Sequence, residues 1–381
     1  MENVLTAKPQ RVIQFIIDGL HWKAPEKLRM PVLNALIPEG VYIRRSYMIV
    51  PHHPTVGDYG KLHSSSFPNP VLQEGNLFIS PENKMLQELF SPEKVTAFIA
   101  NTKAYVSVSR GFTINIHNQQ LSDAEVVKES IALLRQHDIA YFRIHLQTPG
   151  NEGRYLSYTT PDKAYYRNIW GDQSPYVQAI EAADVLLGEL IAELKNTDKW
   201  DTTLLVVTSD HGQSEQGWHP MIDEDSVVTP LLFTGPSVAK NRKPEYFEHT
   251  DITPTIAGIM EIEKPAVNGG SGIFIREVLA LAEEGTVKHP GYIRTINRQL
   301  NTYNALRARI MIAGETNTYY SSLISYLENE LLTPEPFYHQ DRFLEWHKAG
   351  STQHLINVND NILQQMKKEL SGRNAADETA I

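Results

Sequence analysis

Two aspartates in this sequence directly follow short apolar runs, and each has glycine close behind it. Asp18 ends "RVIQFIID" (11–18), and Asp210 ends "TLLVVTSD" (203–210) with His211 beside it. Two carboxylates and an imidazole suit zinc, manganese or a similar divalent ion. Buried together without such a partner, the same charges would be costly. The pattern therefore predicts a divalent metal site, with helix capping by each aspartate as the alternative.

A third reactive segment is "IVPHHPTVGDYGKLHSSSFP" (49–68). Its Thr55 follows a rigid His-His-Pro stretch and precedes a predicted helix start. At a helix N-terminus, backbone N–H groups lie near the hydroxyl and can receive an anion. Next to a metal ion, Thr55 would be a usable nucleophile at neutral pH. The alternative is an N-cap threonine.

Strands must position these side chains, and the near-continuous apolar runs predict where they lie. Four runs are well defined, and a fifth is shorter: 11–18, 95–100, 139–146, 203–210 and 230–236. Runs of five to eight apolar residues are typical of parallel strands covered on both faces. Because ligands bind outside the carboxyl ends of such strands, Asp18 and Asp210 are expected at one edge of the sheet.

Helical patterns separate the strands, at 30–40, 122–138, 174–196 and 251–260. The second begins with Ser-x-x-Glu, a capping box. Strands alternating with helices predict an α/β fold with a mostly parallel central sheet and helices on both faces. We expect this domain to span 10–280, a helical extension packed on it to span 281–370, and a frayed tail to span 371–381.

Composition excludes several classes of partner and of reactive site. The formal net charge of -10 and the absence of a basic run argue against a nucleic-acid polymer as partner. The chain has no cysteine, which excludes thiolate metal sites and a cysteine nucleophile. The N-terminus lacks the apolar core of a signal peptide, and no apolar stretch is long enough for a membrane span. The expected location is periplasmic or secreted if a signal peptide was removed, and cytoplasmic otherwise.

The ordered set of motifs resembles the alkaline phosphatase superfamily. The set comprises the strand with Asp-Gly, "MPVLNALIPEGV", the threonine loop, "SDHG", "GWH", "PLLFTGP" and "HTDITPTI". The nearest branches are the nucleotide pyrophosphatase/phosphodiesterases and the sulfatase-like hydrolases. The resemblance implies a metal ion held by Asp18, Thr55, Asp210 and His211, with Thr55 attacking phosphorus to form a covalent intermediate. Zinc is the expected ion, with manganese, calcium or magnesium as alternatives.

The family's second metal ion is less certain in this chain. His219 in "QGWHP" matches one family ligand, with a structural role as the alternative. In "HLQTPGNEG", aligned on Gly150, the other two ligands fall on Gln147 and Asn151, whose amides supply no charge. The second site is therefore absent, weak and calcium- or magnesium-like, or rebuilt from His145, Glu152 or Asp172.

Two alignments with the family place different residues at the position of the nucleophile. With Thr55 at the family position, Ser64 and Pro68 fall on the family's downstream Thr and Pro without a gap. Asp58 then stands where the phosphodiesterases have an Asn that binds the transferred group. An alignment shifted by two residues would put Gly57 at the attacking position. A protein with that alignment would be inactive in the family's usual mechanism.

The long aromatic loop "YLSYTTPDKAYYRNIWGDQSPY" (155–176) directly follows the altered turn. Loops of this length are often functional. We expect Asp58, Asn151, Tyr165 and Trp170 to contact the substrate. The alternative is that the loop aromatics pack on the edge of the sheet.

These observations predict a metal-dependent hydrolase of phosphate mono- or diesters that holds one or two ions. The substrate would be a small molecule, a lipid head group or a glycan that carries a phosphate or sulfate ester. Two alternatives stay open: a degenerate member that binds such a ligand without turnover, and a sulfate or phosphonate ester hydrolase. The formylglycine mechanism of sulfatases is disfavoured because its usual cysteine precursor is missing.

Overall fold

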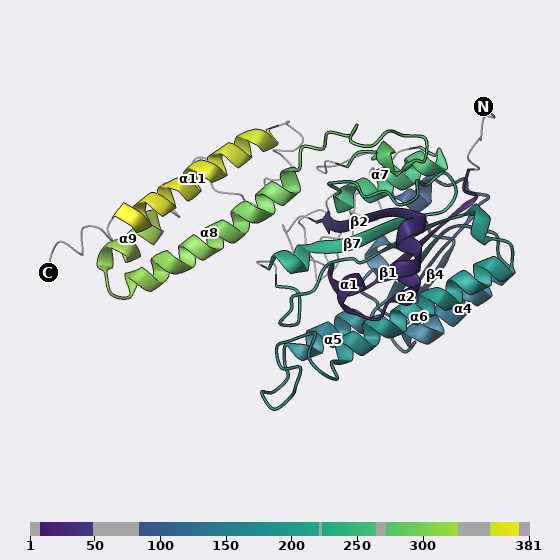
Figure 1. The fold of residues 1–381 in the computed structure, drawn as a ribbon, viewed down its shortest axis with the longest axis horizontal. Helices are drawn as coiled ribbons and strands as arrows, with labels where there is room; N and C mark the ends of the chain where they lie inside the picture. The colour runs from purple at the N-terminus through teal and green to yellow at the C-terminus, as the bar shows by residue number, and fades with distance from the viewer. Residues whose placement is uncertain (1–7, 49–83, 221–222, 264–271, 327–350, 373–381) are drawn as a thin grey trace. The chain divides into compact units, whose positions relative to one another are not determined.

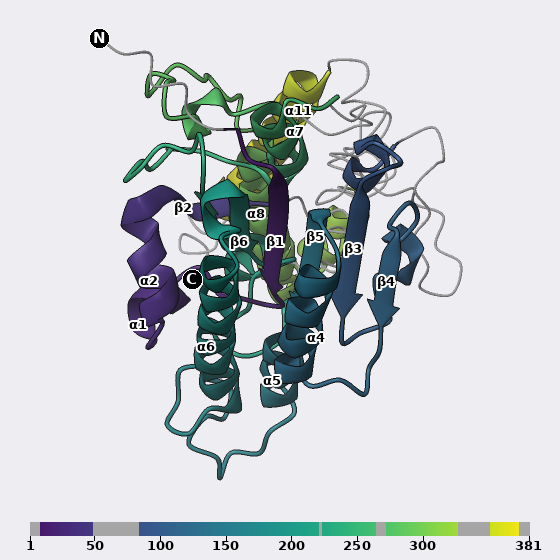
Figure 2. The ribbon, with the colours of Figure 1, turned by 90° about the vertical axis from the view of Figure 1, so that its right-hand side faces the viewer.

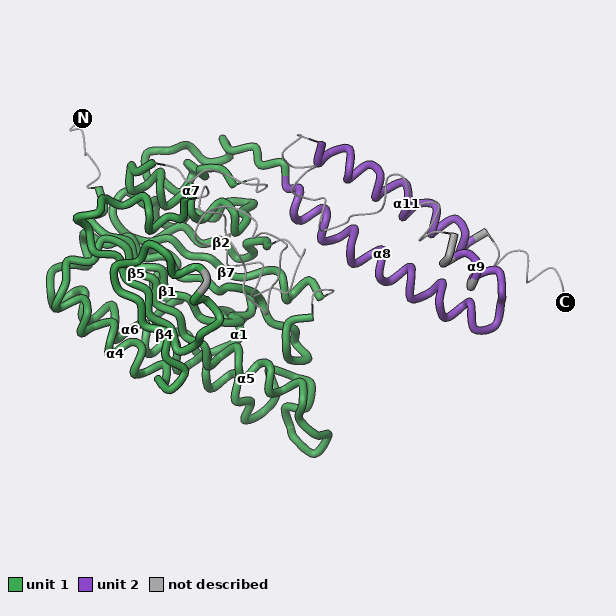
Figure 3. Tube along the Cα trace, turned by 180° about the vertical axis from the view of Figure 1, so that it is seen from behind, with its two compact units in different colours: residues 1–290 green, residues 291–381 purple. Residues whose placement is uncertain are grey.

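The computed structural model describes residues 8–48, 84–220, 223–263, 272–326 and 351–372. Thr55 and Asp58 lie outside these residues, as does most of the predicted tail. The chain divides into two compact units, residues 1–290 and 291–381, shown in separate colours in Figure 3. The predicted packing of a helical extension on the α/β domain stays a prediction.

The first unit is built on a seven-stranded sheet in the order β2-β7-β6-β1-β5-β3-β4. In chain order the strands are β1 (Arg11–Ile17), β2 (Gly40–Tyr47), β3 (Val95–Ala100), β4 (Ile114–His117), β5 (Ile139–Leu146), β6 (Thr203–Thr208) and β7 (Val228–Thr234). Among these described strands, β7 pairs antiparallel with β6 and β2, and the other pairs are parallel. The predicted mostly parallel α/β sheet is confirmed (Figure 1).

Six helices are described in this unit: four lie where the sequence pattern predicted helices, and two, at 24–27 and 148–156, were not predicted. They are α1 (Ala24–Lys27), α2 (Pro31–Leu36), α4 (Asp123–Gln136), α5 (Thr148–Leu156), α6 (Pro175–Asn196) and α7 (His249–Met260). The capping box of α4 forms as predicted. The Ser122 hydroxyl accepts from the Glu125 backbone N–H at 3.2 Å, and the Glu125 carboxylate accepts from the Ser122 backbone N–H at 2.8 Å.

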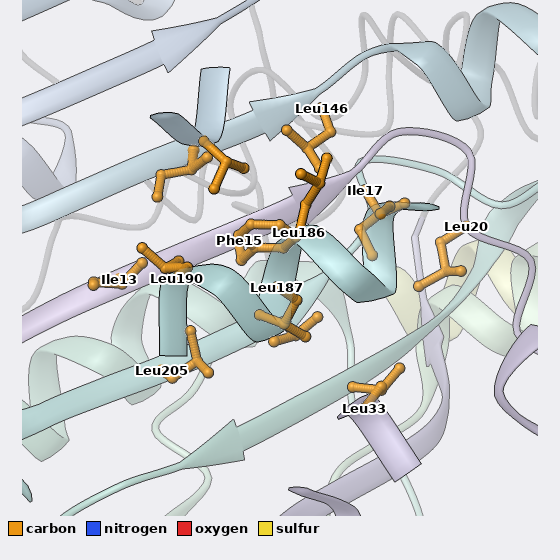
Figure 4. Close-up of a cluster of buried hydrophobic side chains, with 14 of the residues drawn as sticks. Ile13, Phe15, Ile17, Leu20, Leu33, Leu146, Leu186, Leu187, Leu190 and Leu205 are labelled. Carbon is orange, nitrogen blue, oxygen red and sulfur yellow. The ribbon is translucent and has the colours of Figure 1, made fainter. Parts of the chain in front are cut away.

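Two hydrophobic clusters, one on each face of the sheet, hold this unit together. Alternate residues of β1 point to opposite faces, so Phe15 joins the cluster with α2, α4 and α6 while Ile16 joins the one with α7. Figure 2 shows α4 and α6 in front of β1, β5 and β6. Figure 4 shows Phe15 of β1 and Leu187 of α6 among the side chains of the first cluster. Each fully buried side chain of this kind contributes about 1.5–3 kcal/mol.

One polar contact fixes α2 against α6. The helix α2 has no capping side chain of its own, but the buried carboxylate of Asp184 on α6 accepts from Val32 and Leu33 backbone N–H groups at 2.9 and 2.8 Å. These are first-turn donors that the helix cannot satisfy internally. The segment that follows β1 is thereby held on the helical layer.

The second unit contains the described helices α8 (Tyr292–Gly314), α9 (Thr318–Tyr326) and α11 (Thr352–Gly372). Gln299 of α8 donates through its amide to the Ile356 carbonyl at 2.9 Å and to Asp360 at 2.8 Å. The Asn359 amide nitrogen donates a hydrogen bond to Gln299 Oε1 at 2.9 Å. This polar contact fixes the register of α8 against α11. No helix in the described part of the chain combines the length and apolarity needed to cross a bilayer.

Candidate metal centre

The two aspartates predicted from the strand ends lie side by side. Strands β1 and β6 are parallel neighbours in which Ile16 faces Thr208, so Asp18 and Asp210, two residues further along, emerge at the same edge. Both carboxylates are buried, at 2% and 0% exposure. The backbone N–H of Gly19 donates to Asp210 Oδ1 at 3.2 Å, which ties the two strand ends together.

His211 joins these carboxylates in a defined tautomer. Its Nε2 lies 3.6 Å from Asp18 Oδ1 and 3.4 Å from Asp210 Oδ2, and the residue is 1% exposed. Its Nδ1 lies 2.7 Å from the Gly212 carbonyl oxygen. Because a carbonyl can only accept, Nδ1 carries a proton, and Nε2 is the ring nitrogen that faces the carboxylates. Histidine ligands of metal ions commonly have this arrangement.

A second imidazole, that of His145, approaches the Asp18 carboxylate from the β5 side of the sheet. His145, near the end of β5, is fully buried, and its Nε2 lies 3.2 Å from Asp18 Oδ2. Burial lowers the pKa of His145 to about 3, so this imidazole is neutral. Donor atoms of Asp18, His145 and Asp210 all lie within 4.8 Å of one another. The sequence suggested His145 for a rebuilt second site, and the structure places it against the first.

The charges of this cluster need a positive partner. Burial, and then the nearby Asp210 carboxylate, raise the pKa of Asp18 well above its ordinary value. Burial also acts to raise the pKa of Asp210, but His211, His145 and hydrogen bonds outweigh it and hold that pKa low. Two buried carboxylates are stable together when a proton or a cation lies between them. The oxygens of Asp18 and Asp210 and the His145 nitrogen within this space, with His211 Nε2 at 3.6 and 3.4 Å from the two carboxylates, suit a borderline divalent ion.

Sequence reasoning missed Tyr105. Its hydroxyl donates to Asp210 Oδ2 at 2.5 Å, and its ring centroid lies 4.7 Å from that of His145. The residue is fully buried in the irregular segment after β3. No periodicity or motif marks that segment, so no sequence signal was present to single Tyr105 out.

The two amides at the altered family positions lie one helical turn apart. Gln147 precedes the first turn of α5, and its Nε2 lies 3.5 Å from Oδ1 of the exposed Asn151. A hydrogen bond from the Gln147 side chain acts to lower the pKa of Asp18, against the larger effect of burial. Glu152 on α5 is partly buried and Asp172 is exposed. Neither belongs, within the described residues, to a group of carboxylates and imidazoles close enough to share an ion.

His219 lies close to the first centre. Its ring centroid is 4.1 Å from that of His211, and the residue is 8% exposed. The preceding turn contains two left-handed residues, Gly217 with φ 93° and Trp218 with φ 61°. Trp218 donates its backbone N–H to the Gly153 carbonyl on α5 at 2.9 Å, which anchors the turn. A left-handed tryptophan is uncommon and is held here by these contacts.

The loop aromatics contact the helical layer. Tyr165 and Trp170 both pack against the cluster on the α6 face. The Trp170 ring centroid lies 4.9 Å from that of His21, with Lys27 Nζ 4.6 Å from its centroid. A substrate contact for these two residues stays a prediction, as do the roles of Thr55 and Asp58 outside the described residues.

Two further groups of carboxylates and imidazoles have other partners. Asp225, beside His21 and Glu215, lies 3.8 Å from Lys23 Nζ, and Lys23 also contacts Glu215 at 2.8 Å. The second group, Glu248, Asp251 and His289, surrounds the start of α7. There the carboxylate of Asp251 accepts from the Glu248 backbone N–H at 2.8 Å, and Glu248 caps the helix.

Comparisons with known proteins agree with this fold. Residues 75–262 match the model of the Sulfatase family, and the chain has the fold of the alkaline phosphatase superfamily. A 2-O GAG sulfatase is one solved neighbour, with a TM-score of 0.60 and 16% identity over 74% of this chain and 76% of that one.

Two curated relatives align over shorter stretches. GPI ethanolamine phosphate transferase 2 of Aspergillus oryzae is 30% identical over 135 residues, which is 32% of this chain and 16% of that protein. The 2,3-bisphosphoglycerate-independent phosphoglycerate mutase of Yersinia pestis is 31% identical over 112 residues, 28% of this chain and 21% of that protein. The match thus covers about a fifth of each relative's length. The superfamily comprises metal-dependent hydrolases and transferases of phosphate and sulfate esters.

Proposed function

We propose that this chain is a metal-dependent hydrolase of phosphate esters. The observation that carries the proposal is the buried group of Asp18, Asp210, His145 and His211 at the carboxyl edge of the sheet. Such a group is costly to bury unless a proton or a cation lies between its carboxylates, and a divalent cation can contact all of its donor atoms. A divalent ion held there would polarise an ester oxygen and favour ionisation of a nearby hydroxyl.

The proposed mechanism assigns metal-binding, orienting and nucleophilic roles to different residues. Asp18, Asp210 and His211 hold the ion, and Tyr105 and Gly212 orient two of them through the hydrogen bonds described above. Thr55 is the proposed nucleophile. Its oxygen forms the new bond to phosphorus as the bond to the leaving alcohol breaks, and water then cleaves the phosphothreonine to release phosphate. In a diester reaction the released product is the monoester.

One feature of the sequence favours phosphate esters over sulfate esters as the proposed substrates. The formylglycine nucleophile of sulfatases usually derives from cysteine, and the chain has none. A threonine hydroxyl suits phosphoryl transfer, in which the enzyme ester is readily hydrolysed.

The test combines metal analysis with a substrate panel. Purified protein is stripped with chelator, reloaded with Zn²⁺ or Mn²⁺, and assayed on p-nitrophenyl phosphate, bis-p-nitrophenyl phosphate, p-nitrophenyl sulfate and a phosphonate ester. We expect metal-dependent turnover of a phosphate ester that Thr55→Ala reduces by at least about 100-fold. Thr55→Ser should retain part of it, and Thr160→Ala, on the exposed part of the loop, should retain all of it. Unchanged hydrolysis by Thr55→Ala would refute the assignment.

A second candidate function follows from Gln147 and Asn151. With amides in place of two family ligands, the alternative is a protein that binds a phosphorylated or sulfated ligand without turning it over. No tightly bound ion, measurable affinity for inorganic phosphate and no turnover of any ester in the panel would favour this function over hydrolysis, whereas one tightly bound ion favours a single-metal hydrolase.

A further inference from the structure

His145 occupies a position set by the central strands of the sheet. In the parallel register, His145 on β5 lies opposite Ile16 on β1 and Ala100 on β3. It therefore reaches Asp18, two residues beyond Ile16, from the side opposite β6. Its Nε2 lies 3.2 Å from Asp18 Oδ2, and a donor atom of Asp210 lies within 4.8 Å.

Neither tautomer of His145 is well satisfied by the described protein groups alone. If Nδ1 carries the proton, the Nε2 lone pair faces Asp18 Oδ2, and this contact is attractive only when a proton or a cation lies between the two atoms. If Nε2 carries it, the Nδ1 lone pair is buried with no hydrogen-bond partner among the described residues. An unpaired buried acceptor is unfavourable. A cation between His145 and Asp18 makes the tautomer with the proton on Nδ1 favourable, because the Nε2 lone pair and the Asp18 oxygen then both face positive charge.

The two imidazoles of the cluster stand on opposite sides of Asp18. His211 Nε2 approaches Asp18 Oδ1 at 3.6 Å, whereas His145 Nε2 approaches Asp18 Oδ2 at 3.2 Å. The four side chains come from β5, from the end of β1 and from the end of β6, three strands that are neighbours in the sheet. Donor atoms of Asp18, Asp210 and His145 lie within 4.8 Å of one another, and His211 Nε2 adjoins them at 3.4 Å from Asp210 Oδ2. Two carboxylates balance the charge of one divalent ion, and with the two imidazoles they provide the number of ligands that zinc prefers.

We propose that His145 is a fourth protein ligand of the Asp18–Asp210–His211 centre. This inference rests on the proposed function for the presence of the ion. It differs from the sequence-based suggestion that His145 rebuilds the second site. A donor set with two nitrogens favours zinc over calcium and magnesium, which prefer oxygen ligands.

The test compares His145→Gln with a matched histidine. His117 on β4 packs edge-on against Phe98, with ring centroids 4.6 Å apart, and belongs to none of the described carboxylate–imidazole groups. Apo protein of each variant is titrated with Zn²⁺ against a chromophoric chelator and then with Co²⁺, whose visible absorption reports coordination number. We expect His145→Gln to weaken Zn²⁺ binding by roughly 100-fold or more and to reduce the Co²⁺ absorption. His117→Gln should leave both measurements unchanged.

X-ray absorption of the zinc-loaded wild type counts imidazoles directly and does not depend on the folding of a variant. Two imidazoles are expected, and His219→Gln should not reduce that number. The proposal is overturned by a single imidazole, by a count that falls in His219→Gln, by native Zn²⁺ affinity in folded His145→Gln, or by a wild type that binds no zinc. Zinc binding that depends on His145 in a protein without esterase activity would refute only the proposed function.

Discussion

A methyl group on the Cα of Gly150 would stand 1.6 Å from Oδ1 of Asp18. The first turn of α5 therefore packs directly on the carboxylate at the end of β1. No side chain larger than hydrogen fits between them without moving the helix or the aspartate. Gly150 thus limits how far Asp18 can turn away from Asp210 and His145.

Gly150→Ala is expected to reduce metal affinity more than it reduces stability. The added methyl must displace Asp18 or α5, and a shift of a fraction of an ångström disturbs ligand geometry. Zinc titration should show a loss of at least about 10-fold, the effect typical of disturbing a metal ligand's support. Gly188→Ala on α6 is the control, because its methyl would lie 3.1 Å from Val32 and far from the site. Equal zinc affinities in the two variants would contradict this account.

Tyr105→Phe should weaken metal binding while leaving the fold intact. The change removes only the hydroxyl that donates to Asp210, and hydrogen bonds to charged groups contribute about 1.5–3 kcal/mol. We expect roughly 10- to 100-fold weaker zinc binding by competition titration. Tyr141→Phe serves as the control, since it removes a buried hydroxyl that donates to Gln14. The prediction fails if both variants bind zinc like the wild type.

The sequence predicted the strands at the centre of the sheet and placed the candidate ligands Asp18 and Asp210 at their ends. Apolar runs predicted β1 and β6, and the abrupt change to Asp18 and Asp210 marked their ends. The edge strand β2 was not predicted, because Arg44 and Arg45 interrupt its apolar residues where the register with β7 shifts. Charged residues and irregular pairing are common on edge strands.

The remaining parts of the site depend on tertiary contacts. Tyr105 reaches Asp210 across 105 positions in sequence, from a segment with no regular pattern. His145 was recognised as a possible ligand, but only the register of β5 against β1 shows which carboxylate it approaches. The fit of Gly150 against Asp18 was likewise invisible, because a glycine in "TPGNEG" is equally consistent with an ordinary turn.

Asp225 should make stability depend on pH in the acid range. Burial acts to raise its pKa, but hydrogen bonds from His21 and Trp22 outweigh burial and lower the pKa from 3.8 to about 2. A depressed pKa contributes stability above pH 3.8 that is lost as pH falls through about 2. Urea unfolding should show Asp225→Asn less stable than the wild type at pH 6, with the difference shrinking below pH 4. A difference that is constant with pH would exclude this ionisation as its cause.

Trp170→Ala separates packing from substrate contact in the aromatic loop. The Trp170 ring lies against His21, Lys27 and the helical layer, whereas Tyr158 is 67% exposed. We expect Trp170→Ala to reduce the free energy of unfolding by roughly 2–3 kcal/mol and Tyr158→Ala to change it by less than about 0.5 kcal/mol. If Trp170→Ala instead keeps full stability and changes KM for one ester in the panel, the loop's role in the substrate pocket is supported.

Strands β6, β1 and β5 are adjacent, so the spacing between the side chains at their ends is the spacing of the sheet itself, about 4.8 Å between neighbouring strands. Backbone hydrogen bonds keep that interval constant whatever the connecting loops contain. Residues beyond the strand ends, such as Gln147 at the start of α5 and Asn151 within it, can therefore differ without moving Asp18, His145 or Asp210. An arrangement of this kind allows one chemical centre to be retained while the molecules it acts on diverge.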